Sequence, residues 1–214
     1  MGGSVGGKSG GQLVKRRGML AGVALVLCGM MLTGCSRPGE DEFKRRVDEA
    51  FVCKGMEVAD INRLDSMPGI YSYVARYNFQ YRLTDGDKAA QDFYAKLLEL
   101  AEVKGDDWKA AVNAPKVQAY LLDECTEGAQ PIVESMFEDV LTQLGEKKTA
   151  VRLPVAIPVS GWAEFMPGKR GWDITMHRER LGEELVYSQQ PVKRDVLVKK
   201  AAGSAKSGKK GGKK

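Results

Sequence analysis

Apolar side chains recur at every second position in one stretch, which is the clearest strand signal in the chain. In residues 70–83, IYSYVARYNFQYRL, aromatic or apolar residues alternate with mostly polar ones. Side chains of a strand point alternately to the two faces of its sheet, so the pattern predicts a strand with one aromatic face. The aromatic members of that face are Tyr71, Tyr73, Tyr77, Phe79 and Tyr81.

Helical spacing appears on both sides of this strand. Phe43, Val47, Ala50 and Phe51 fall at i, i+4, i+7 and i+8, which predicts a helix from Asp41 to Phe51. Apolar residues at helical spacing return over residues 87–145 and are interrupted by Gly105, Pro115 and Pro131 before Gly145. We therefore expect a block of several helices over residues 87–145.

Alternation resumes after the block, in residues 152–168 and 170–180. Pro154 and Pro158 indicate that the first of these strands begins at a sheet edge, because proline cannot donate to a strand ladder. The short runs LVYS (185–188) and DVLV (195–198) are expected to add small strands. The order of helix, strands, helical block and strands predicts one α+β domain over residues 41–198, with an antiparallel sheet.

The first 35 residues carry a different signal. Lys15, Arg16 and Arg17 precede an uncharged run from Met19 to Leu32, which is shorter than the roughly twenty apolar residues needed to span a bilayer. Such a run is typical of a secretory signal. The following Leu32-Thr33-Gly34-Cys35 resembles the lipobox of bacterial lipoprotein precursors. That resemblance implies removal of residues 1–34, acylation of Cys35 by chains such as palmitate, and a short tether over residues 35–40.

Several acyl chains hold a protein on a membrane without crossing it. With Ser36 after the cysteine, the resemblance implies a location at the outer membrane, facing the periplasm. Two alternatives stay open: a secreted protein with an ordinary cleavage site, and export through the twin-arginine route suggested by Arg16-Arg17. Residues 2–9, GGSVGGKS, match the spelling of a phosphate-binding loop, but no strand can precede them and the expected cleavage removes them.

Cleavage would change the charge balance. The chain has 33 basic and 28 acidic residues, and four of the basic ones precede Cys35, so the remainder is nearly neutral. Residues 199–214 hold seven lysines and no acid, which leaves an acidic body before them. This tail is predicted to be disordered. It could bind lipopolysaccharide or another anionic envelope polymer, or simply be solvated; export argues against nucleic acid as a partner.

The expected processing leaves two cysteines for the folded domain. Cys28 departs with the signal and Cys35 carries lipid, so Cys53 and Cys125 are predicted to form a disulfide in an oxidising compartment, with two buried free thiols as the alternative. One histidine and no Cys-x-x-Cys spacing give no reason to expect a metal.

No arrangement of reactive side chains indicates an enzyme or a cofactor. Ser160, His177 and a nearby acid could be assembled into a triad, but no nucleophile-elbow sequence accompanies them. The aromatic face is expected to be core or, alternatively, the wall of a small-ligand pocket, and Trp162 and Trp172 to be core or partner-docking residues. The sequence therefore predicts an envelope lipoprotein with a structural or interaction role, with an envelope protein among its candidate partners; the alternative is a small-ligand-binding module.

Overall fold

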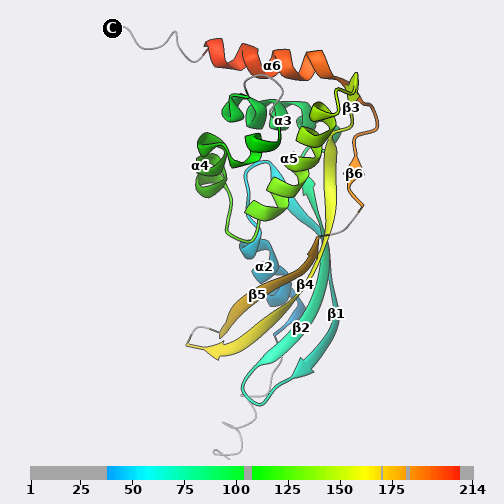
Figure 1. Cartoon of the computed structure of the whole chain (residues 1–214). Coiled ribbons are helices and arrows are strands. Elements are labelled where there is room, and N and C mark those ends of the chain that lie inside the picture. Colours follow the sequence, from blue (N-terminus) through cyan, green and yellow to red (C-terminus); the bar gives the residue numbers. More distant parts are fainter. Residues whose placement is uncertain (1–37, 104–107, 170, 182–183, 208–214) are drawn as a thin grey trace, which may run out of the picture. The chain divides into compact units, whose positions relative to one another are not determined.

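The computed structural model describes residues 38–103, 108–169, 171–181 and 184–207 (Figure 1). The chain divides into two units, Met1–Arg37 and Pro38–Lys214, and the first lies wholly outside the described residues. The predicted signal, the lipobox with Cys35 and the beginning of the tether therefore fall outside the described part.

An antiparallel sheet forms the centre of the second unit. It contains β1 (Met56–Pro68), β2 (Tyr73–Leu83), β4 (Pro154–Gly168) and β5 (Gly171–Leu181) in the spatial order β1-β2-β4-β5. A short strand, β6 (Val186–Tyr187), pairs with the start of β4, and β3 (Ala150–Val151) pairs with β7 (Val192–Lys193) in a separate two-stranded sheet. The α+β class with an antiparallel sheet is confirmed.

Helices lie before and within this series of strands. Helix α2 (Glu40–Ala50) comes first, and the block between β2 and β3 consists of α3 (Asp87–Ala101), the 3-10 turn η2 (Lys109–Asn113), α4 (Pro115–Glu124) and α5 (Gln130–Gly145). Each of α4 and α5 has proline in its first turn, where a missing N–H costs nothing. The predicted helical block over 87–145 is confirmed.

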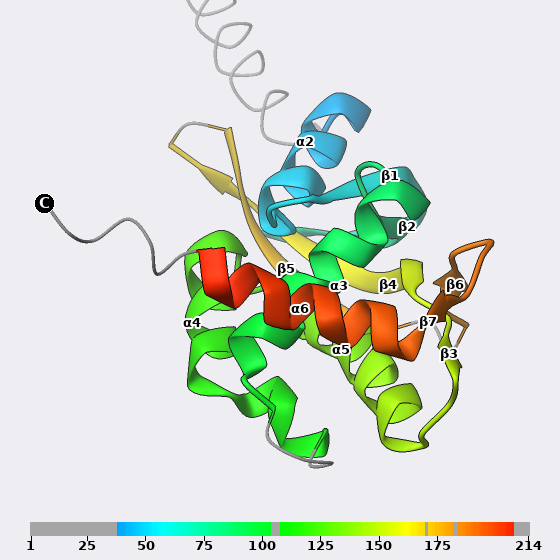
Figure 2. The same ribbon diagram turned by 90° about the horizontal axis from the view of Figure 1, so that it is seen from above.

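The helices cover one face of the sheet (Figures 1 and 2). Helix α3 contacts β2 and β4, α5 contacts β4, and α2 contacts β1 and β5. Burial along β2 alternates accordingly: its inward residues from Tyr73 to Leu83 are buried and most intervening ones are half-buried or exposed. The core therefore lies between this face and the helices.

One strand is missing from the predicted elements, and two local expectations are wrong. β1 was not predicted, because its mostly exposed residues give no apolar alternation. β4 does not begin at a sheet edge: Ala156 pairs with β2 on one side and β6 on the other, and Pro158 lies where the partner of β4 changes from β6 to β5. Ile70 and Tyr71 precede β2 and belong to the turn that joins it to β1.

The C-terminal expectation also needs correction. The DVLV run is helical, not a strand, and lies in α6 (Arg194–Ser207), so residues 199–207 are helical rather than disordered. Leu197 and Ala201 of this helix are buried, and Lys200 forms an ion pair of 2.5 Å with Asp92 of α3. A short apolar run cannot distinguish a strand from a buried helical turn by its period. Residues 208–214 lie outside the described part.

Gly161 lies where β2, β4 and β5 approach one another closely. It lies opposite Tyr77 of β2, at a register shift between β4 and β5, and the Tyr77 hydroxyl donates a hydrogen bond of 3.3 Å to the carbonyl oxygen of His177. A Cβ at position 161 would overlap that backbone carbonyl and would stand 2.6 Å from the Tyr77 hydroxyl. Only glycine leaves room for the tyrosine ring and its hydrogen bond.

We therefore expect Gly161→Ala to lower the free energy of unfolding by about 2 kcal/mol or more, as overpacking of a filled core does. Urea denaturation of the purified protein measures this change. The matched control is Gly145→Ala, at the end of α5, where the nearest atoms to an added Cβ are ordinary contacts at 3.8 Å or more. Equal stability of the two variants would contradict the packing described here.

The buried tyrosines predict a loss of stability at alkaline pH. Burial raises the pKa of Tyr81, and burial followed by the nearby carboxylate of Asp139 raises the pKa of Tyr94 well above its ordinary value. The Tyr94 hydroxyl also donates a hydrogen bond of 2.8 Å to the Pro154 carbonyl. Above about pH 10 the unfolded tyrosines release protons that the folded ones keep, so stability must fall as the pH rises.

Urea denaturation at increasing pH should show this fall. Tyr94→Phe should reduce the slope by up to about 1.4 kcal/mol per pH unit, since one ionisation is removed from the unfolded state. At neutral pH the same variant should cost about 1–3 kcal/mol, because the buried Pro154 carbonyl loses its donor. An unchanged slope in Tyr94→Phe would refute the assignment of the alkaline sensitivity to Tyr94.

Candidate functional site

The aromatic face of β2 is part of the core. Tyr73, Tyr77, Phe79 and Tyr81 are each at most 6% exposed. Phe51, just after α2, packs against two of them, with ring centroids 4.8 Å from Phe79 and 6.4 Å from Tyr77. Tyr71 is 86% exposed and lies outside this face. The structure thus places four of the five predicted aromatic residues together and separates the fifth.

The hydroxyls on this face are closed off from solvent. Those of Tyr73 and Tyr81 have no hydrogen-bond partner in the described part of the chain, whereas Tyr77 donates to the His177 carbonyl. A buried polar group without a partner costs about 1–3 kcal/mol. These hydroxyls line no described pocket, so a ligand would reach them only if the core opened.

The two tryptophans lie on opposite faces of the sheet. Trp172 packs edge-on against the core ring of Phe165, with centroids 6.5 Å apart, so it belongs to the inner face. Trp162 pairs with His177 across β4 and β5, and their rings stack at 3.8 Å on the outer face. Both tryptophans are half-buried. The stacked pair of Trp162 and His177 is thus partly exposed on the outer face.

The strand register does not set the serine of the possible catalytic triad directly opposite the histidine. Ser160 pairs with Arg180 of β5, while His177 pairs with Trp162 and its imidazole stacks on the indole. The stacked ring has its own partner, and the register does not set the serine opposite it. Within the described residues, no group of three His, Cys, Asp or Glu side chains is arranged to hold a metal ion.

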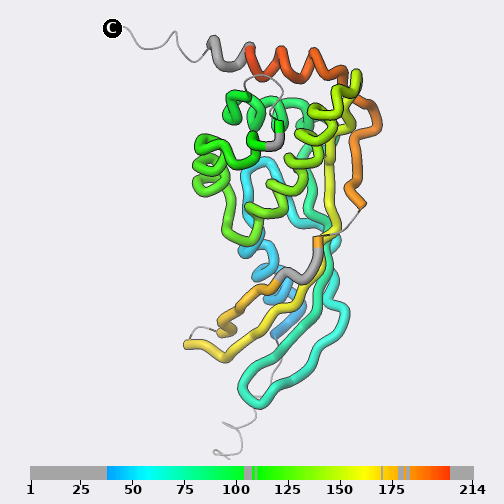
Figure 3. Tube along the Cα trace, in the orientation of Figure 1, coloured from blue at the N-terminus to red at the C-terminus, as the bar shows by residue number. Residues whose placement is uncertain are grey.

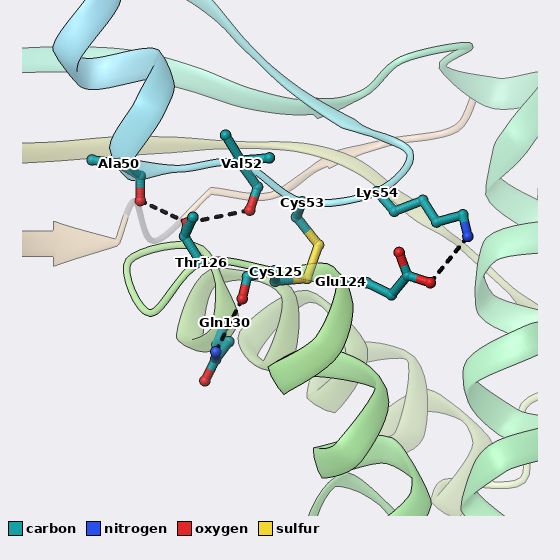
Figure 4. Close-up of a disulfide and its surroundings, with 8 residues drawn as sticks. All are labelled: Ala50, Val52, Cys53, Lys54, Glu124, Cys125, Thr126 and Gln130. Carbon is teal, nitrogen blue, oxygen red and sulfur yellow. Dashed lines mark hydrogen bonds and ion pairs between the residues drawn. A yellow bond between two sulfur atoms is a disulfide. The ribbon is translucent and has the colours of Figure 1, made fainter.

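A disulfide joins the link between α2 and β1 to the end of α4 (Figure 4). Cys53 and Cys125 are bonded with Cα atoms 4.0 Å apart, and this is the pairing predicted by counting cysteines. Backbone hydrogen bonds flank it: Thr126 N donates to Val52 O at 2.8 Å, and Lys54 N donates to Glu124 O at 3.1 Å. The two segments therefore form a short strand-like contact, which no sequence pattern predicts.

Side chains strengthen the same contact. The Thr126 hydroxyl donates to the Ala50 carbonyl at the end of α2, at 2.7 Å, and Lys54 forms an ion pair of 3.0 Å with Glu124. The pair is largely exposed, so its contribution to stability is small. The covalent bond and the backbone hydrogen bonds hold the α2–β1 link against the α4–α5 link.

An open cleft of about 700 Å³ lies beside this junction. Its apolar part comes from Phe51, Pro131, Ile174 and Met176, and its rim carries Arg46 and two carboxylates. Arg46 is already engaged by Glu42, Glu49 and the Trp172 carbonyl. The described lining thus combines apolar side chains with one arginine and two carboxylates, and it contains no histidine, serine or cysteine. Sequence reasoning missed it because its residues come from three distant segments.

The described helices include none long and apolar enough to cross a membrane. Comparison with known proteins finds no matching family model, no matching curated protein and no matching solved structure. The function of the chain must therefore be inferred from its own residues.

We expect replacement of both Cys53 and Cys125 by alanine to lower the free energy of unfolding by about 4 kcal/mol, because the bond closes a loop of 72 residues. Urea denaturation with and without a reductant measures this change; the reductant should destabilise the wild type only. Mass analysis after alkylation under denaturing, non-reducing conditions gives an independent test. Labelling of both cysteines in the wild type would contradict the disulfide.

Proposed function

We propose that the protein is a lipid-anchored cell-envelope lipoprotein whose folded domain has a structural or interaction role. The observation that carries the proposal is the combination of a basic cluster, an uncharged run of fourteen residues and Leu32-Thr33-Gly34-Cys35, in that order. The three features together match the signal of lipoprotein precursors, and any one of them alone would be common. Acylation of Cys35 would hold the domain at the membrane surface.

Two features of the folded domain agree with this location. A disulfide between Cys53 and Cys125 suits an oxidising compartment such as the periplasm. The helix α2 begins at Glu40, only five residues after Cys35, so the domain would stay within a few residues of its anchor. The lysines near the C-terminus would add a salt-sensitive attraction to anionic envelope polymers or lipopolysaccharide.

An interaction role is supported by the surfaces that remain open. These are the Trp162–His177 stack on the outer face and the mixed cleft beside the disulfide. The alternative, a small-ligand module built on the aromatic face, has less support because that face is filled by the core. Catalysis has no supporting group of side chains in the described part of the chain.

Replacement of Cys35 tests the anchor. We expect Cys35→Ala to abolish acylation and move the protein from the membrane to the soluble fraction of cells that express the full precursor. Radiolabelled palmitate incorporation and cell fractionation measure the two effects. Cys28→Ala, within the same uncharged run, is the matched control and should remain acylated and membrane-bound. Membrane retention of Cys35→Ala without label would refute the proposed anchor.

A further inference from the structure

The most exposed apolar side chains of the described residues gather at the end of the β1–β2 hairpin. Met67, Ile70 and Tyr71 are 72%, 90% and 86% exposed, more than any other large apolar residue described. Ile70 and Tyr71 lie in the turn between the strands, where Gly69 N donates to Ser72 O at 2.7 Å, and Met67 lies in the last two residues of β1. We call residues 67–71 the apolar tip.

The apolar tip is also free of charge. Residues 66–75, SMPGIYSYVA, contain no Asp, Glu, Lys or Arg, although such residues make up 29% of the chain. The nearest charged residues along the chain are Asp65 and Arg76, which face each other on the two strands at 4.0 Å. A hairpin that displays isoleucine, methionine and tyrosine with no charge is suited to the boundary between lipid headgroups and acyl chains, where tyrosine is enriched.

The beginning of the folded domain is fixed to the same hairpin. Arg63 of β1 donates to the Pro38 carbonyl at 3.2 Å and forms an ion pair of 3.0 Å with Glu40. The tube view shows β1 and β2 running past α2 to their turn (Figure 3). This turn lies at the end of the sheet opposite helices α3, α4, α5 and α6. The apolar tip therefore lies at the end of the domain where the chain enters it.

Chain lengths match a shared membrane contact. Three residues lead from Pro38 back to Cys35 and can span about 11 Å at most. Five residues of strand lead from Arg63 to Pro68 and span about 17 Å. With the tether fully extended, a hairpin directed straight toward the membrane would thus pass the anchor by about 6 Å, comparable to the roughly 5–10 Å depth at which interfacial elements are buried.

We propose that the apolar tip inserts into the membrane surface beside the lipid on Cys35, so that the domain is held at two points in a fixed orientation. This inference rests on the proposed lipid anchor. A protein partner fits the tip less well, because specific interfaces cover about 800 Å² on each side and the tip consists of only five residues at one end of a hairpin. Two contacts with one membrane would keep the outer face and the cleft turned in constant directions.

Photocrosslinking in the intact lipoprotein tests the insertion. The photoreactive residue p-benzoylphenylalanine replaces Tyr71 in one variant and Leu122 in the other. Leu122 lies on α4 and is 68% exposed, so it is a matched apolar control far from the tip along the chain. The acylated proteins are reconstituted in vesicles of phosphatidylethanolamine and phosphatidylglycerol, irradiated, and digested for mass analysis.

We expect phospholipid adducts at position 71 at a level several-fold above position 122. Equal levels, or adducts at position 71 to protein instead of lipid, would overturn the insertion. The N-terminal peptide of the same digest reports the acyl chains on Cys35. Acylated Cys35 without lipid adducts at position 71 refutes the insertion alone, whereas an unmodified Cys35 refutes the proposed anchor.

Discussion

Burial of the inward face of β2 is the constraint on which the rest of the domain depends. Tyr73, Tyr77, Phe79 and Tyr81 alternate along the strand, and each full burial of such a ring is worth about 2 kcal/mol or more. The rings also determine their surroundings. Phe51 must cover Phe79, and Gly161 must lack a side chain so that Tyr77 can lie across it. The positions of α2 and β4 follow from these contacts.

The sequence predicted those parts of the fold that repeat a strong period. The alternation in β2 and the helical spacing over 87–145 were both unambiguous, and their order fixed the fold class. β1 was missed because an edge strand with one half-buried face needs few apolar residues. The DVLV run is mistaken for a strand because four residues are too few to reveal a period. In the folded chain the run is helical, and Leu197 is buried against the rest of the domain.

Functional surfaces were less accessible to prediction than the core. Cys53 and Cys125 could be paired by elimination, because removal of two other cysteines left only them. The cleft beside them could not be foreseen, since Phe51, Pro131 and Met176 meet only in the folded chain. The alternation of residues 70–83 places Ile70 and Tyr71 of the apolar tip in the predicted strand, although they precede β2. Exposure, not pattern, separates a turn residue from a core residue there.

The disulfide has a topological consequence. It closes a covalent ring that contains β1, β2, α3, η2 and α4, while α2 and the segments from α5 onward lie outside it. A single proteolytic cut of the backbone anywhere between residues 54 and 124 would therefore leave one covalent molecule, which separates into fragments only on reduction. A cut after Cys125 would leave the remaining C-terminal segment without a covalent connection to the ring, so that only noncovalent packing would hold it. The ring thus protects the connection between the N-terminal end of the domain and its helical block against a single nick.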